Sequence, residues 1–362
     1  MAMLLVALLG VTACQPQPEA SRQMDNYLER VGRVLGQSWE PWQSDSLSDY
    51  RLPPRRERML EVPEIRIGLL DLVVESRRCQ TLQQVVSERN SSLGRLMPAS
   101  HLLAYEGDLL RAIEACLQVI EGDDSRAGLR KQLSEIMQIK RDNLPAAFWN
   151  ALNGSGEFES YLRFADRPLP VTATPVTDHE ALAALQVLAG IGAALPDELP
   201  PGREQIEPLL QALQRSDRSS QLIHTLSRLT HTLEQAAAML EARPPNHLCP
   251  LGAPTERSRI LMNVFTTFYA GELQPILAQT QRLGTPWQSS LAALSQVPGA
   301  PEPTAEYLAS LVTADDSLWN RYQRGLARHT QAWQEVLGAC QQGPGQEGWQ
   351  AQPENAQALR MR

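Results

Sequence analysis

Hydrophobic residues recur every three or four positions along most of the chain, the spacing that places them on one face of an α-helix. The segment 24–35 is the clearest case, with apolar side chains at Met24, Tyr27, Leu28, Val31, Val34 and Leu35. The same spacing predicts further helices at 65–74, 79–89, 102–120, 129–139, 145–149, 178–195, 206–213, 222–240, 256–283, 291–294, 307–312 and 318–340. No run alternates apolar and polar residues as a strand does. We expect an all-α fold, a multi-helix bundle.

Proline-rich and polar stretches divide this helical pattern. Residues 167–177, RPLPVTATPVT, hold three Pro and three Thr and predict an extended linker between two helical halves that share one core. Ser100 and Asp178 are expected as helix N-caps. The expected organisation is a leader at 1–13, a tether at 14–23, helical regions at 24–166 and 178–341 on either side of the linker, and a disordered tail at 342–362.

The first fourteen residues, MAMLLVALLGVTAC, form an uncharged apolar run too short to cross a bilayer as a helix. Their end, Val11-Thr12-Ala13-Cys14, resembles the bacterial lipobox, in which an aliphatic residue and two small residues precede an obligatory cysteine. That resemblance implies that the Cys14 thiol receives a diacylglyceryl group and that the leader is cleaved before it. The alternative is a buried N-terminal helix whose cysteine is incidental.

Lipidation would make the membrane itself a partner of this protein. Each buried acyl methylene contributes about 0.8 kcal/mol, so two or three chains anchor a protein durably. In enteric-type bacteria, Asp after the lipidated cysteine favours retention in the inner membrane, whereas this chain carries Gln15. The expected location is therefore the periplasmic face of the outer membrane, with lipid as the anchor.

Four cysteines remain besides Cys14, an even number that suits an oxidising compartment. The midpoint between Cys79 and Cys116 falls at a predicted turn, so a helical hairpin would bring the two sulfurs level. Cys249 precedes a long helical segment and Cys340 ends the last one, so antiparallel packing would join them too. We expect disulfides Cys79–Cys116 and Cys249–Cys340; the alternative is four buried free thiols.

Two stretches of the chain resemble an uncharacterised family of proteobacterial lipoproteins, a domain of unknown function. The first is Ser87-Glu88-Arg89-Asn90-Ser91-Ser92-Leu93-Gly94-Arg95, with Ser100, Tyr105, Glu106 and Cys116 after it. The second is Leu261-Met262-Asn263-Val264-Phe265-Thr266-Thr267-Phe268-Tyr269, followed by Gln274-Pro275. The resemblance implies one family region over nearly the whole mature chain and supports the lipid anchor. It implies no activity.

Composition and motifs exclude several function classes. The formal charge is −8 with no long basic block, which argues against nucleic-acid binding. The chain has no G-x-S-x-G, S-x-x-K or Walker motif, and its six His include no H-E-x-x-H. We therefore expect no catalytic residue, no cofactor and no metal site.

The hairpin loop offers the most specific candidate binding site. Arg89, Asn90 and Ser91 lie in the predicted turn region, and Tyr105 and Glu106 lie on the helix that follows. Together they could form a polar recognition patch at the hairpin tip. The alternative is a capping network that fixes the hairpin beside its disulfide.

These observations favour a binding or assembly component of the cell envelope whose partner is an unidentified envelope protein. Helical surfaces offer grooves for partner segments. Two alternatives stay open: a cell-wall glycan hydrolase that uses carboxylates on helices, and a carrier of apolar ligands. Two acids with raised pKa in a cleft would favour the enzyme, and a dry tunnel lined by Leu and Phe would favour the carrier.

Overall fold

The computed structural model describes residues 17–63, 78–92, 94–243 and 245–346, and over these ranges it is helical with no strand. The all-α expectation is confirmed. The expected leader, Cys14, the expected helix at 65–74 and the tail from residue 347 lie outside the described residues. Among the described helices, none is both long and apolar enough to cross a membrane.

The longer elements are α-helices joined by short turns. They are α1 (Glu19–Leu35), α3 (Gln80–Asn90), α4 (Ala99–Val119), α5 (Ala127–Asp142), α6 (Leu144–Gly154), α7 (Gly156–Leu162), α8 (His179–Ala194), α9 (Arg203–Gln214), α10 (Arg218–Glu241), α11 (Pro245–Leu248), α12 (Glu256–Val264), α13 (Gln274–Ser295), α14 (Glu302–Leu308) and α15 (Leu318–Ala339). Two π-helical segments, η5 (Phe265–Leu273) and η6 (Ala309–Thr313), continue α12 and α14. Short 3-10 turns occur at η1 (Ser44–Tyr50), η2 (Arg55–Glu57), η3 (Gly94–Leu96) and η4 (Asp124–Arg126).

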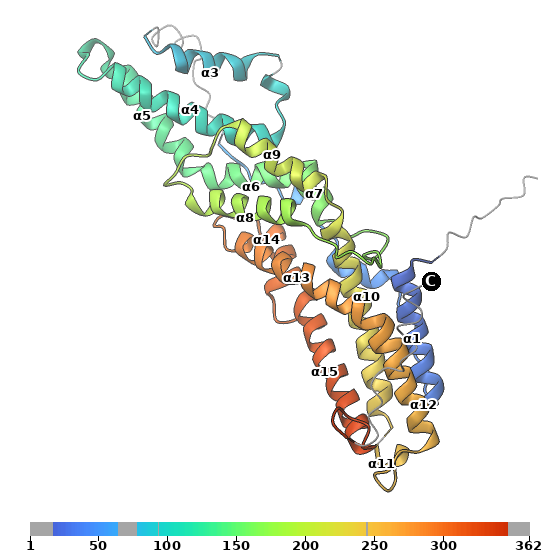
Figure 1. Ribbon diagram of the computed structural model, residues 1–362. Coiled ribbons are helices and arrows are strands. Elements are labelled where there is room, and N and C mark those ends of the chain that lie inside the picture. The colour runs from blue at the N-terminus through green and yellow to red at the C-terminus, as the bar shows by residue number, and fades with distance from the viewer. Residues whose placement is uncertain (1–16, 64–77, 93, 244, 347–362) are drawn as a thin grey trace, which may run out of the picture.

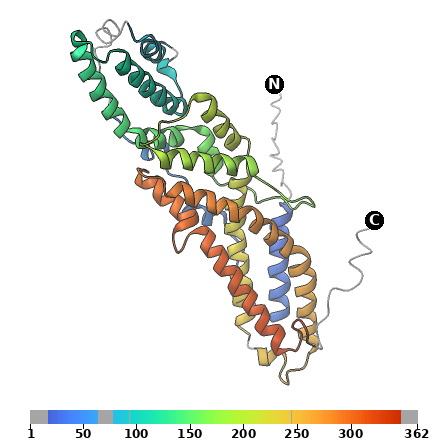
Figure 2. The ribbon, with the colours of Figure 1, turned by 60° about the vertical axis from the view of Figure 1, so that its left-hand side comes forward.

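The molecule is elongated, and its helices are distributed along the long axis (Figures 1 and 2). Helices α3, α4 and α5 form one end, and α11 lies at the other. Helices α1, α10, α12 and α15 run side by side toward the α11 end. Helix α1 begins about midway along the body in both views.

The main core surrounds α10, which is buried on nearly every side against α1 and α15. Its leucines at 222, 226, 229 and 233 are fully buried. The helix also buries three threonines, whose hydroxyls donate to carbonyls one turn earlier: Thr225 to Gln221, Thr230 to Leu226 and Thr232 to Arg228, at 2.8–2.9 Å. These bonds satisfy polar groups that would otherwise be costly to bury.

A second, smaller core joins α3, α4 and α5, where Leu82, Val86, Ile113 and Leu133 are buried together. The disulfide Cys79–Cys116 lies in this core, with its Cα atoms 5.1 Å apart, and closes the α3–α4 hairpin. The second disulfide, Cys249–Cys340, joins the loop before α12 to the end of α15, with a Cα separation of 5.3 Å. Both expected pairings are confirmed.

Several element boundaries differ from the expected ones. The expected helix at 256–283 is divided into α12, the π-helical η5 and α13, and α13 continues through the expected separate segment at 291–294. Helix α4 begins at Ala99, so its N-cap is Pro98 and the expectation of Ser100 is wrong.

Asp178 is the N-cap of α8, as expected, but its side chain does not bond to the helix backbone. Instead its Oδ2 accepts a hydrogen bond of 2.9 Å from the Tyr161 hydroxyl. The expected linker at 167–177 is non-helical and packs on the body: Leu169 is buried, and its N–H donates to Thr225 Oγ1 at 2.8 Å.

Candidate functional site

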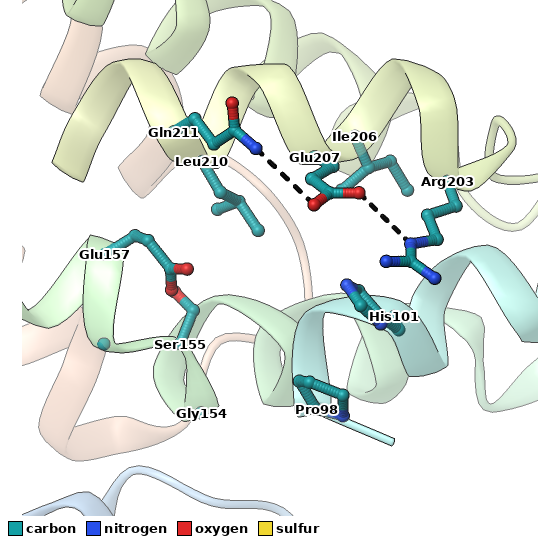
Figure 3. Close-up of a pocket in the computed structure, with 11 residues that line it drawn as sticks. Pro98, His101, Gly154, Ser155, Glu157, Arg203, Ile206, Glu207, Leu210 and Gln211 are labelled. Atoms are coloured by element: carbon teal, nitrogen blue, oxygen red, sulfur yellow. Dashed lines mark hydrogen bonds and ion pairs between the residues drawn. The ribbon is translucent and has the colours of Figure 1, made fainter. Parts of the chain in front are cut away.

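A surface pocket of about 170 Å³ lies between the beginnings of α4 and α7 and one face of α9 (Figure 3). It is lined by Pro98, His101, Gly154, Ser155, Gly156, Glu157, Arg203, Ile206, Glu207, Leu210 and Gln211. We call it the α4–α9 pocket. Because its lining comes from three separate segments, only the folded body assembles it.

The turn between α6 and α7 forms one wall of this pocket. The Ser155 hydroxyl donates to Leu152 O at 2.9 Å and accepts from the Phe158 N–H at 3.2 Å, so it caps α7. Both roles of this hydroxyl are structural, since they close one helix and start the next. Ser155 is therefore a poor nucleophile candidate despite its place in the pocket.

Helix α9 supplies a row of polar side chains along the opposite wall (Figure 3). Arg203 Nε donates to Glu207 Oε2 at 3.1 Å, and Gln211 Nε2 approaches Glu207 Oε1 at 3.5 Å. The three residues are four apart, so they share one face of the helix. Glu207 is thus held from both sides and its negative charge is balanced by Arg203.

His101 and Glu157 complete the polar rim, from α4 and α7 respectively. Burial lowers the pKa of His101, the Arg203 charge lowers it further, and the carboxylates of Glu207 and Glu157 oppose these effects. The imidazole is therefore neutral at neutral pH. Within the described part of the chain, the side chains of His101 and Glu157 form no hydrogen bond and no ion pair. Both side chains are therefore available to bind a ligand.

The floor of the pocket is apolar, because Ile206 and Leu210 on α9 line it; each is only 3% exposed. An apolar floor under a polar rim suits a group with an aliphatic stem and a polar head. Small-molecule sites usually enclose about 300–1,000 Å³, so a pocket of this size suits one side chain of a partner better than a cofactor.

A second pocket, of about 220 Å³, lies between the loop before η1, α10 and the start of α15. It is lined by Glu40, Pro41, Trp42, Gln43, Ser46, Asp49, Tyr50, Ser227, Thr230, His231, Glu234, Leu318 and Arg321. The Trp42 indole lies 5.0 Å from the Arg228 guanidinium and 4.9 Å from the His224 ring, and its N–H donates to Ser227 Oγ at 3.3 Å. These contacts hold the loop on α10.

The expected recognition patch at the hairpin is bonded largely to itself. Arg89 Nη1 donates to Gly94 O, and Asn90 Nδ2 donates to the Val86 carbonyl at 2.7 Å. The Ser91 hydroxyl donates to Glu88 O at 2.7 Å and accepts from the Gly94 N–H at 3.0 Å. Such bonds are the ones expected for the alternative interpretation, in which these residues form a capping network.

The helix following the hairpin places the two remaining patch residues beside it. The Tyr105 ring lies 6.0 Å from the Arg89 guanidinium, and burial raises the pKa of Tyr105 to about 12. Glu106 forms an ion pair of 2.7 Å with Lys140 on α5. The structure thus brings all five residues to one region, and a binding role for them stays a prediction.

Carboxyl groups with raised pKa lie away from both pockets. Burial raises the pKa of Asp178, at the N-cap position of α8, and that of Glu272 in η5. Neither lines the α4–α9 pocket or the second pocket, which holds Trp42. In the described ranges no group of three His, Cys, Asp or Glu side chains is arranged to hold a metal ion.

Sequence reasoning did not identify the residues of the α4–α9 pocket. His101, Glu157, Arg203 and Glu207 come from segments about fifty residues apart, and none belongs to a motif. The one local signal was Gly154-Ser155-Gly156, which breaks the helical pattern and is typical of a plain loop.

Comparison with known families places the chain in one of them. Residues 24–344 match the family model described as "Protein of unknown function (DUF3080)". The match covers the α4–α9 pocket and all four disulfide cysteines, and the chain belongs to this family. No curated protein and no solved structure matched it.

Proposed function

We propose that this DUF3080 protein is a lipid-anchored component of the bacterial envelope that binds a protein partner on the periplasmic face of the outer membrane. The observation that carries the binding role is the α4–α9 pocket, where His101 and Glu157 stand available above an apolar floor. The Val11–Cys14 sequence supports the anchor, and Gln15 supports the outer-membrane location. The two disulfides support an oxidising compartment.

The pocket's chemistry indicates the kind of group that it binds. Glu207 already pairs with Arg203, whereas the Glu157 carboxylate has no such partner in the described chain. A Lys or Arg side chain of the partner would lay its aliphatic stem on Ile206 and Leu210 and pair its charged head with Glu157. Such a side chain would act as the anchor of a larger, otherwise weak contact.

One observation favours a second candidate, the glycan hydrolase. Glu157 and Glu207 are two helix-borne carboxylates that line the same pocket, and glycosidases use such a pair. Two observations weigh against it: Glu207 is held in an ion pair, and the carboxyl groups with raised pKa lie elsewhere. The charged rim of the pocket argues against the carrier of apolar ligands.

Photocrosslinking in intact cells tests the proposal. A photoreactive amino acid at Gln211, on the exposed rim, should capture a specific envelope protein through a Lys- or Arg-containing peptide. Glu157→Gln should weaken binding of that purified partner roughly 5- to 30-fold, about 1–2 kcal/mol for one partly exposed charge pair. Glu180→Gln is the matched control, because Glu180 is exposed on α8 outside the pocket, and it should bind normally.

Two outcomes would contradict the proposal. Equal binding by Glu157→Gln and Glu180→Gln would remove the pocket from the interaction. Loss of glycan turnover in both Glu157→Gln and Glu207→Gln, with no captured protein, would establish the hydrolase instead.

A further inference from the structure

The start of the described chain is fastened firmly to the body. Gln17 Nε2 donates to Oδ2 of Asp25, in the second turn of α1, at 2.7 Å. Both oxygens of Asp25 also accept from Arg228 Nη2 at 2.8 Å, and the Arg228 side chain is only 10% exposed. From Ala20 onward the inner face of α1 is buried in the main core.

This attachment leaves little free chain before the proposed lipid. Cys14 precedes Gln17 by three residues, and three fully extended residues span at most about 10 Å. If Ala20, the first buried residue of α1, is taken as the attachment point, six residues separate it from Cys14. The fully extended chain between them spans at most about 20 Å. In either case the beginning of α1 has to remain close to the headgroups of the bilayer.

The place of that attachment on the body decides what orientations are possible. Helix α1 begins about midway along the long axis, and the body extends from there toward the α3–α5 end and toward the α11 end (Figures 1 and 2). If the body stood upright on the membrane, one of its two halves would have to enter the bilayer. Both halves carry exposed ion pairs, Lys131–Glu135 on α5 and Arg328–Glu241 near the α11 end, and burying such charges in lipid would be costly.

We infer that the protein lies lengthwise on the membrane, held at its middle, with the side on which α1 begins facing the lipid surface. This inference rests on the lipidation of Cys14 in the proposed function. Both ends then extend parallel to the bilayer, so the α4–α9 pocket is held near the membrane rather than projected across the periplasm. A partner that uses the pocket has to present its basic side chain close to the same surface.

Neutron reflectometry on a supported bilayer measures the orientation directly. The protein is purified from bacterial membranes with its native lipid and compared with a variant that carries twenty Gly/Ser residues between Gln15 and Pro16. Wild-type protein should form a thin layer that matches the short dimension of the body. The insertion adds a flexible tether of about 25 Å, so its layer should be thicker and more diffuse.

The outcomes separate this inference from the proposed function. A wild-type layer as thick as the body is long, on protein whose Cys14 is acylated, would overturn the inference alone. An insertion variant with an unchanged layer would also overturn it, because the short tether would then not set the orientation. Protein that has no acyl group and forms no layer would remove the proposed anchor, and the inference with it.

Discussion

The two disulfides should stabilise different parts of the fold, although both close long loops. They span 37 and 91 residues, Cys79–Cys116 and Cys249–Cys340 respectively. Loop entropy alone gives stabilisations of about 4 and about 5 kcal/mol. That model predicts nearly equal losses of global stability when either pair is replaced by alanine.

The packing around each bond predicts otherwise. In the described chain, α3 buries only Leu82 and Val86 beyond Cys79, which is worth roughly 5 kcal/mol of apolar burial. Fixing the eleven residues of α3 costs on the order of 10 kcal/mol or more in backbone entropy. Without its disulfide, α3 should therefore detach while the main core stays folded. Cys340, by contrast, ends α15, which packs along α10 in that core.

Hydrogen exchange measured by mass spectrometry, together with urea unfolding, distinguishes the two behaviours. The Cys79→Ala/Cys116→Ala protein should lose protection throughout α3, with little change in the unfolding of α10 and α15. The Cys249→Ala/Cys340→Ala protein should keep α3 protected but lose about 5 kcal/mol of global stability. Two results would refute this reasoning. One is full protection of α3 in the protein that lacks Cys79–Cys116, and the other is an unchanged urea unfolding transition in the protein that lacks Cys249–Cys340.

Three further changes test the packing of the body. Burial lowers the pKa of His329 to about 3. Between about pH 6.5 and 3 the unfolded chain binds more protons than the folded one, so the free energy of unfolding should fall as pH falls through that window, by about 2 kcal/mol at pH 5. In His329→Gln, the urea concentration at the unfolding midpoint should depend less on pH over the same window. Gly284→Ala should destabilise by about 1–3 kcal/mol in thermal melts because its Cβ would collide with Trp319, whereas Gly190→Ala, where a Cβ meets no atom within 4 Å, should stabilise by about 0.5–1 kcal/mol; equal effects would contradict the packing. Arg58 is 1% exposed and donates three hydrogen bonds to the chain, so Arg58→Ala should cost about 3 kcal/mol in chemical denaturation, and a loss below 1 kcal/mol would contradict this.

Local patterns in the sequence were sufficient for most of the helices and for the Cys79–Cys116 disulfide. The spacing of Met24, Tyr27 and Leu28 marks a buried helical face, and in the structure these residues are fully buried. The midpoint of Cys79 and Cys116 marks the hairpin turn, because two residues equally far along the chain from the turn of an antiparallel hairpin lie level with each other. Both predictions depend only on helical geometry within one segment or between two neighbours.

The α4–α9 pocket depends on information that local patterns do not contain. His101, Glu157 and Glu207 meet only because the beginnings of α4 and α7 pack beside α9, and helix periodicity does not specify which helices pack. The position of α1 shows the same limit: its apolar face is evident from sequence, but its packing on α10, nearly two hundred residues later, is not. The expected N-cap at Ser100 was wrong because the helix begins one residue before it, at Ala99, and Pro98 takes the N-cap position.

The mass of the mature chain tests the central claim, an envelope protein anchored by lipid, most directly. Protein purified from bacterial membranes should begin at Cys14 and carry a diacylglyceryl group on its thiol, with its amino group acylated as well. A chain that retains residues 1–13 and an unmodified Cys14 thiol would contradict the account.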